Sequence, residues 1–144
     1  MISARDSTIA DCTMVELSGN VSRSGSLTVV QPGQNCPFKI RRVYYLFDLP
    51  AGAVRGGHAL RALHQFVVAG SGSFEVRLDD GREGRTVTLN RPDRALHLVP
   101  GIWRELRDFS SGGICLVLAS DTFDERDYFR QHSDFLAFKA GQEA

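Results

Sequence analysis

The chain has 144 residues, of which 42% are hydrophobic and 24% charged, and its 17 basic residues balance 17 acidic ones. This composition predicts one globular domain, residues 1–144, with a sizeable core. The zero net charge gives no support for nucleic acid or a membrane surface as a partner, because both usually require a basic excess. No apolar run approaches the roughly 20 residues of a membrane span.

The cysteines predict a reducing compartment. Cys12, Cys36 and Cys115 are odd in number and widely spaced, with no CxxC pair. That pattern disfavours a disulfide framework or a zinc knuckle. No signal peptide fits the start, because Asp6 and Asp11 interrupt any apolar region. We therefore expect a cytoplasmic protein.

Short segments of alternating or β-branched residues follow one another along most of the chain, with turn signals between them. In chain order the expected strands are Thr13–Leu17, Ser26–Gln31, Phe38–Asp48, His58–Ala69, Phe74–Leu78, Arg85–Leu89, Leu96–Val99, Ile102–Leu106 and Ile114–Ala119. Asp79-Asp80-Gly81 predicts a hairpin. The tail from Asp124 to Phe138 spaces its aromatic residues roughly as a helix does, so it predicts short helical turns packed on an all-β sandwich or barrel.

The expected strand that starts at His58 holds the first candidate site. Side chains alternate along a strand, so His58, Leu60, His64 and Phe66 are expected on one face. A metal-binding cupin would carry His, His and Glu at the first three of these positions and another His where Arg104 stands. A guanidinium offers no lone pair to a metal. The pattern therefore favours a metal-free pocket that uses His58, His64 and Arg104, and no cofactor is expected.

Longer strings resemble a narrower family. They are Arg42-Val43-Tyr44-Tyr45, Arg55-Gly56-Gly57-His58-Ala59, Val76-Arg77-Leu78-Asp79-Asp80-Gly81, Pro100-Gly101-Ile102-Trp103, Asp108-Phe109-Ser110-Ser111, Val117-Leu118-Ala119-Ser120-Asp121 and Phe123-Asp124-Glu125-Arg126-Asp127-Tyr128. In this order they look like the cupin-superfamily dTDP-sugar 3,4-ketoisomerases, also called WxcM-like proteins, over roughly residues 22–138. The resemblance implies a single cupin jelly-roll barrel with a short C-terminal helical segment.

The family resemblance also implies an activity. Such enzymes are metal-independent isomerases that act on dTDP-4-keto-6-deoxyglucose in the biosynthesis of deoxy and amino sugars, which supply lipopolysaccharide and other glycans. They are homodimers, commonly with exchanged N-terminal strands. The resemblance places the catalytic base at His58, a pocket tyrosine at Tyr44, and at Arg104 a residue tied to the stereochemistry at C4. Where the family has a second histidine, this chain has Leu60.

The remaining candidates follow from the chemistry of the reaction. Moving a keto group from C4 to C3 requires removal of the C3 proton, an enediol(ate), and delivery of a proton to C4. A histidine can serve as base and then acid, and Arg104 can stabilise the enediolate. Arg55 or Arg42 could bind the diphosphate, Trp103 could stack on the thymine, and His64 could compensate for Leu60.

Two alternatives stay open. Leu60 lacks the titratable group of the family's second histidine, which favours a non-catalytic cupin that only binds a sugar nucleotide. A divergent metal cupin that uses His58 and His64 is the other alternative. Loss of deuterium exchange with retained nucleotide binding would indicate the first, and metal analysis the second.

Overall fold

The computed structural model describes residues 2–142. Its strands are β1 (Thr13–Glu16), β2 (Gly19–Ser22), β3 (Gly25–Thr28), β4 (Arg42–Leu46), β5 (Arg55–Leu60), β6 (Gln65–Ser71), β7 (Phe74–Asp79), β8 (Gly84–Leu89), β9 (Arg94–Leu98), β10 (Trp103–Arg107), β11 (Ile114–Ala119) and β12 (Tyr128–Phe129). Helix α1 spans His132–Lys139, and short 3₁₀ turns cover Ile9–Asp11 and Glu125–Asp127. None of the helices in this range is long and apolar enough to cross a membrane.

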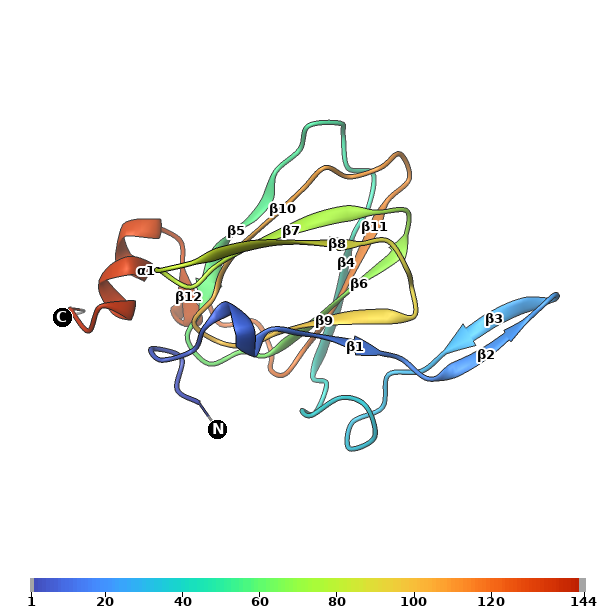
Figure 1. Cartoon of the computed structure of the whole chain (residues 1–144), viewed down its shortest axis with the longest axis horizontal. Helices are drawn as coiled ribbons and strands as arrows, with labels where there is room; N and C mark the ends of the chain where they lie inside the picture. Colours follow the sequence, from blue (N-terminus) through green and yellow to red (C-terminus); the bar gives the residue numbers. More distant parts are fainter. Residues whose placement is uncertain (1, 143–144) are drawn as a thin grey trace.

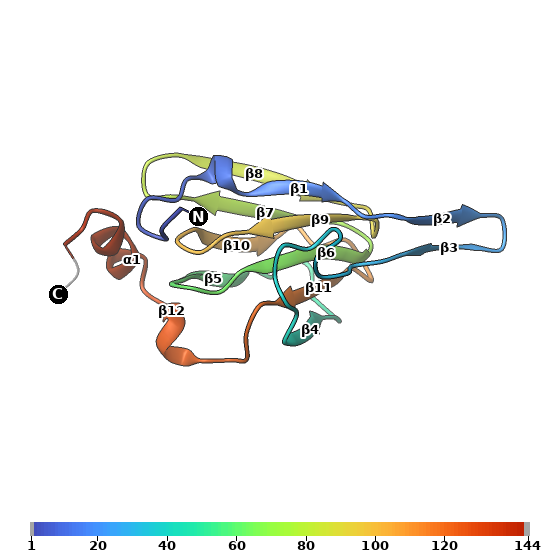
Figure 2. The ribbon, with the colours of Figure 1, turned by 90° about the horizontal axis from the view of Figure 1, so that it is seen from below.

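Ten strands form two five-stranded sheets that face each other (Figure 1). The first sheet has the order β1-β9-β6-β11-β4 and the second the order β12-β5-β10-β7-β8. Strands β2 and β3 pair as a hairpin that projects from the body, at the end opposite α1 (Figures 1 and 2). The expected all-β jelly roll with a short C-terminal helical segment is confirmed.

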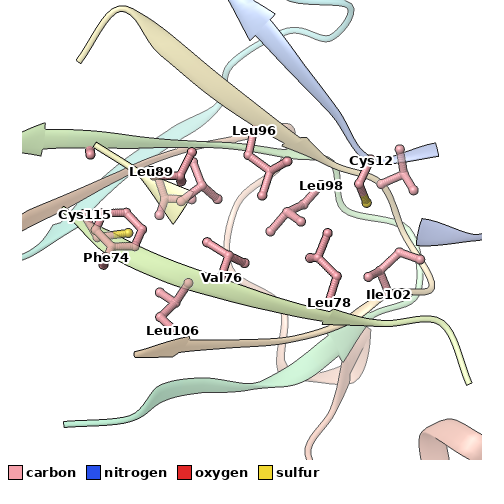
Figure 3. Packing of buried hydrophobic residues seen from close by; sticks show 14 residues of the cluster. Cys12, Phe74, Val76, Leu78, Leu89, Leu96, Leu98, Ile102, Leu106 and Cys115 are labelled. Atoms are coloured by element: carbon pink, nitrogen blue, oxygen red, sulfur yellow. The ribbon is translucent and has the colours of Figure 1, made fainter. Parts of the chain in front are cut away.

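The main core lies between the two sheets (Figure 3). In β7, the buried Phe74, Val76 and Leu78 alternate with partly exposed polar residues, which is the pattern of a strand with one covered face. The expected hairpin after β7 is confirmed, because β7 pairs with β8 in register from Phe74↔Leu89 to Asp79↔Gly84. Burial of this apolar face against the opposite sheet is the main force that holds the sheets together.

A second apolar layer covers the outer face of the first sheet. In β6, Val67 and Ala69 point to the main core, whereas Phe66 and Val68 point outward and belong to another buried cluster. Residues before β4, among them Phe38, pack against this outer cluster. The first sheet is therefore apolar on both faces, which is why β6 has no clear alternation of polar and apolar residues.

The expected continuous strand from His58 to Ala69 is wrong. The chain leaves the second sheet at Leu60 and enters the first sheet at Gln65. The corner between them is held by Asp127, whose carboxylate accepts the backbone N–H groups of Ala62 and Leu63 at 2.9 and 3.3 Å. His58 and His64 therefore lie on different sheets, and their expected common face does not exist.

Two other expected strands are clearly shorter than predicted. The segment Ser26–Gln31 is a strand only to Thr28, and its hairpin partner β2 lies where the sequence predicted no strand. The segment Phe38–Asp48 is a strand only from Arg42 to Leu46. Its start is instead irregular chain that covers the outer face of the first sheet.

Candidate active site

A cavity of about 240 Å³ opens between the two sheets. Its wall combines apolar core residues with a few polar side chains. The lining residues are Tyr44, Leu46, Arg55, Gly56, Gly57, His58, Gln65, Val67, Leu98, Arg104, Leu106, Val117 and Arg130. Apolar and polar side chains share the wall about equally, and polar groups that converge on a hollow of this kind are typical of a small-molecule site.

His58 and Arg104 are neighbours across the sheet. They pair in the antiparallel register of β5 and β10, so their side chains leave the sheet on the same face. Both are buried, with exposures of 9% and 3%. Nε2 of His58 and Nε and Nη2 of Arg104 have no hydrogen-bond partner. Because buried polar atoms are nearly always satisfied, this pair is arranged for a ligand.

A buried polar relay connects Arg104 to Tyr44. Nη1 of Arg104 donates to Oε1 of Gln65, and Nε2 of Gln65 donates to the hydroxyl of Tyr44 at 3.2 Å. The guanidinium of Arg42 covers the Tyr44 ring from the other side, 4.6 Å from its centroid. The relay fixes two hydrogen-bond donors, Arg104 and Tyr44, on the cavity wall.

The electrostatics of the cavity keep His58 neutral. Burial, then the positive charges of Arg104 and Arg130, lower the pKa of His58 to about 2. This value lies far below the ordinary histidine pKa of about 6.5. The difference arises because a second positive charge would have to form in a buried site beside a guanidinium. The imidazole therefore keeps a lone pair that can accept a proton.

The charge of Arg104 itself is not compensated. Its pKa is lowered by burial, and the groups that oppose this shift are phenols and thiols, Tyr44 first and Cys12 second. Among residues 2–142, no carboxylate forms an ion pair with Arg104. A buried cation without an anion favours binding of a negatively charged group beside it.

The rim of the cavity carries Arg55 and Arg130. Arg55 is exposed, at the start of β5. Arg130 donates to both carboxylate oxygens of Glu125, at 2.9 and 2.8 Å, and stacks over the ring of Tyr128. That ring in turn lies 4.9 Å from the ring of His58. The C-terminal segment therefore forms one wall beside His58.

Three other predicted site residues lie outside this cavity. Arg42 lines a neighbouring hollow of about 220 Å³ together with Tyr128. Leu60 is buried against Leu63, Ala119 and Tyr128. The side chain of Trp103, on the opposite face of β10 from Arg104, packs against Phe135 and other aromatic residues of the C-terminal segment.

His64 is also far from the cavity in the fold. It lies on the outer side of the first sheet, where its Nδ1 and Nε2 of His97 are 2.9 Å apart, in hydrogen-bonding contact. Both line an apolar hollow of about 310 Å³ with Phe38. The structure therefore does not bring His64 together with His58, either as a relay or as a second metal ligand. Within residues 2–142, no group of three or more His, Cys, Asp or Glu side chains could hold a metal ion.

Comparison with known proteins assigns the family. The family model described as "WxcM-like, C-terminal" (FdtA) matches residues 10–140. The chain belongs to this family. A TDP-4-oxo-6-deoxy-alpha-D-glucose-3,4-oxoisomerase from Aneurinibacillus thermoaerophilus is 42% identical over 120 residues, which are 83% of this chain and 86% of that relative.

Solved structures agree with this assignment to the WxcM-like family. A 3,4-ketoisomerase from Helicobacter canadensis matches with a TM-score of 0.87 and 36% identity, over 90% of this chain and 98% of that one. The sugar 3,4-ketoisomerase QdtA from Thermoanaerobacterium thermosaccharolyticum, solved in complex with TDP, matches with a TM-score of 0.90 and 31% identity, over 94% and 98%.

The sequence did not single out three residues of this WxcM-like site. Gln65 and Arg130 line the cavity, and Tyr128 touches His58. The sequence does contain a signal for Gln65, because this polar residue directly precedes the apolar run Phe66–Ala69. In the structure Gln65 is fully buried. The aromatic tail was expected to be core, which holds for Phe129 and Phe135 but omits the contact of Tyr128 with His58.

The His64–His97 pair predicts a stability that falls in acid. Burial lowers the pKa of both histidines, that of His97 to about 4 from 6.5. Between these values the unfolded chain binds more protons than the folded chain, so stability is lost as the pH falls through this window. Each histidine contributes up to about 1.4 kcal/mol per pH unit. Urea unfolding at several pH values measures the slope.

The variant His97→Gln is the matched control for that slope. It removes one titrating group and leaves His58 and the cavity untouched. Its free energy of unfolding should depend less steeply on pH between about 4 and 6.5 than that of the wild type. Parallel curves for the two proteins would contradict the assignment.

Proposed function

We propose that this chain is a TDP-sugar 3,4-ketoisomerase that moves the keto group of TDP-4-keto-6-deoxyglucose from C4 to C3. The relative from A. thermoaerophilus is named for this sugar and this reaction. QdtA was solved with TDP, and a variant of it with TDP-4-keto-6-deoxyglucose. The product is a nucleotide-linked keto sugar of the kind used to make deoxy and amino sugars.

One observation carries the proposal. A neutral imidazole and an uncompensated guanidinium, both with unpartnered nitrogens, lie side by side in one cavity. Isomerisation of a keto sugar needs a base for a carbon-bound proton and a cation for the anion that forms. His58 and Arg104 meet these two needs, and no other described cavity holds such a pair.

The proposed mechanism is a pair of proton transfers. His58 takes the proton from C3, and the electron pair of that bond forms the C3–C4 double bond of an enediolate with its charge on the C4 oxygen. Arg104 and Tyr44 donate hydrogen bonds to that oxygen. The proton of the C3 hydroxyl passes to the C4 oxygen and the imidazolium returns a proton to C4, which leaves a carbonyl at C3. One hydrogen has moved between carbons and one between oxygens.

The size of the cavity suits the sugar rather than the whole nucleotide sugar. Its 240 Å³ is below the range of about 300–1,000 Å³ that is usual for pockets of larger ligands. We place the hexose inside and the diphosphate at the rim, beside Arg55 and Arg130, whose guanidinium groups can bind phosphate oxygens. Arg42 and Trp103 lie outside the cavity that would hold the hexose.

The non-catalytic alternative is not favoured. It rested on Leu60, which is buried behind Tyr128 and does not line the cavity. A leucine there supports the Tyr128 ring against His58 and removes no group from the cavity wall.

Isotope exchange tests the proposed function. Incubation of the chain with TDP-4-keto-6-deoxyglucose in deuterium oxide should place deuterium at C3 or C4, as mass spectrometry and NMR can detect. TDP binding without exchange would refute catalysis and return the non-catalytic alternative. A chain that neither binds TDP nor exchanges deuterium would refute the proposed site itself.

We further propose a homodimer in which the β2–β3 hairpin of one copy packs on the other. The hairpin projects from the body, and its Val21 and Leu27 are 82% and 60% exposed. Val43 and Tyr45 of the edge strand β4 are also exposed, as is Phe47 just after it. Such surface is costly in a monomer. Buried, unpaired cysteines support a cytoplasmic location for this dimer.

Light scattering tests the dimer. The wild type should have twice the mass of the chain, and the double variant Val21→Asp, Leu27→Asp should shift toward the monomer because it places charges in the contact. A wild-type chain that stays monomeric at all concentrations would refute this proposal.

A further inference from the structure

Gln65 joins the two hydrogen-bond donors of the proposed site. It begins β6, points into the cavity and is fully buried. Its amide oxygen accepts from Arg104 and its amide nitrogen donates to the Tyr44 hydroxyl. Burying an amide in an apolar core is costly unless both of its ends are hydrogen-bonded. These two partners therefore account for a glutamine in a strand that otherwise contributes apolar residues to the core.

The donor and acceptor groups of Arg104 and Gln65 fix the direction of the two hydrogen bonds in this relay. A guanidinium has only donors, so the amide oxygen must face Arg104. The amide nitrogen must then face Tyr44, and a nitrogen of an amide can only donate. The Tyr44 oxygen thus accepts from Gln65, and its own proton has to point to another acceptor.

We infer that Gln65 is a positioning residue that makes the Tyr44 hydroxyl a hydrogen-bond donor to the substrate. The inference rests on the proposed ketoisomerase function. In that reaction the acceptor is the C4 oxygen, whose negative charge grows as His58 removes the C3 proton. Arg104 and Tyr44 then act together as donors, and Gln65 holds them in fixed relative positions.

The variant Gln65→Glu keeps the hydrogen bond from Arg104 but changes the orientation of the Tyr44 hydroxyl. The new carboxylate has nearly the same shape and accepts from Arg104 at least as well as the amide does. It has no N–H, so Tyr44 must donate to it and can no longer donate to the substrate. We expect kcat to fall about 10²-fold, the loss typical of one missing donor. The new carboxylate also pairs with the charge of Arg104, and a loss of kcat by that route would not depend on the Tyr44 hydroxyl.

A double-mutant cycle with Tyr44→Phe tests whether the effect passes through Tyr44. Once the hydroxyl is gone, Gln65→Glu should lower kcat by less than about threefold further. An equal loss in both backgrounds would overturn the inference. Circular dichroism and TDP binding by calorimetry confirm a folded site. If Gln65→Glu does not fold, the same cycle with Gln65→Met decides the question.

A measurement without substrate tests the orientation directly. The chain has three tyrosines, so a sample labelled at the tyrosine Cζ gives few NMR signals, and Tyr44→Phe assigns one of them. Burial raises the pKa of Tyr44, while Arg104 and the hydrogen bond from Gln65 lower it. In Gln65→Glu the Tyr44 signal should titrate at least about one pH unit higher, because a donor is replaced by an anion. An unchanged titration would overturn the inference.

The two proposals fail in different ways. A wild-type chain without deuterium exchange refutes the ketoisomerase, and the tyrosine titration still decides how Gln65 orients Tyr44. An active wild type with an equally active Gln65→Glu variant refutes the positioning role alone.

Discussion

The variant His58→Asn will lose turnover, with kcat reduced about 10²- to 10⁴-fold, the range that a general acid–base group contributes. Asparagine has a similar polar head but no basic nitrogen that can take up a proton and return it. His58 is held by its strand and by the Tyr128 ring rather than by hydrogen bonds of Nε2, so its replacement should leave the barrel folded. The measurement is kcat with TDP-4-keto-6-deoxyglucose, with TDP affinity as the test of an intact site.

The matched control is His64→Asn. This histidine is half-buried and close in sequence to His58, but it lies on the outer side of the first sheet with His97. The control variant should keep kcat within about twofold of the wild type, because surface and outer-layer changes act on stability rather than on the site. A full loss in His64→Asn together with an active His58→Asn would reverse the assignment of the base.

The neutral state of His58 sets the expected pH dependence of the free enzyme. Burial and the charges of Arg104 and Arg130 lower the pKa of His58 to about 2, so the base is unprotonated near neutral pH. Consequently kcat/KM should show no acidic limb near pH 6.5 from this residue. Initial rates of product formation between about pH 5.5 and 8 measure the pH dependence of kcat/KM. A clear limb near the ordinary histidine value would mean that solvent or a bound anion relieves the burial.

Local patterns in the sequence predicted much of the fold, and the residues themselves explain why. The alternation in β7 and the Asp-Asp-Gly turn act over a few residues, so they predicted the β7–β8 hairpin correctly. His58 and Arg104 could be proposed together because each follows a recognisable string, and β5 and β10 place them opposite each other.

Long-range contacts could not be predicted in the same way. The corner between β5 and β6 depends on Asp127, about 65 residues further along the chain, so nothing near His64 indicates that it changes sheets. Likewise the Gln65–Tyr44 contact spans two strands that both pair with β11. Alternation within one strand shows which of its side chains share a face of the sheet. Only the order of the strands in the sheets decides which other residues those side chains contact.

Leu60 shows how a departure from a family pattern can mislead. In the sequence it looked like a lost catalytic group, because a family histidine was missing. In the structure it forms an apolar support with Leu63 and Ala119 beneath Tyr128. His58, Arg104 and Tyr44 line the cavity without any contribution from Leu60. Whether a site is complete is decided by the groups on the cavity wall rather than by the number of matched positions.

The variant Arg104→Met will lose activity without losing stability. Without the guanidinium, the enediolate loses a charged donor, and kcat should fall about 10²- to 10³-fold. The folded protein meanwhile no longer buries a cation that has no anion beside it, and replacement of such groups by apolar side chains is often stabilising by about 1–4 kcal/mol. Part of that gain is offset by the Gln65 oxygen, which loses its partner at a cost of about 1–3 kcal/mol. The melting temperature should therefore stay level or rise.

Arg91→Met is the control for this variant. Arg91 is an exposed arginine whose Nε lies 3.1 Å from Asp93, and it lies outside the cavity. It should keep its activity and leave the melting temperature almost unchanged, because an exposed ion pair adds little to stability. TDP-sugar should also raise the melting temperature of the wild type more than that of Arg104→Met, because only the wild type offers the buried cation to the ligand. Inactivity with a clearly lower melting temperature would instead make Arg104 a structural residue. Lower activity together with equal or higher stability is the result expected for a cation that is kept for catalysis. The buried guanidinium destabilises the folded protein, whereas its charge stabilises the enediolate.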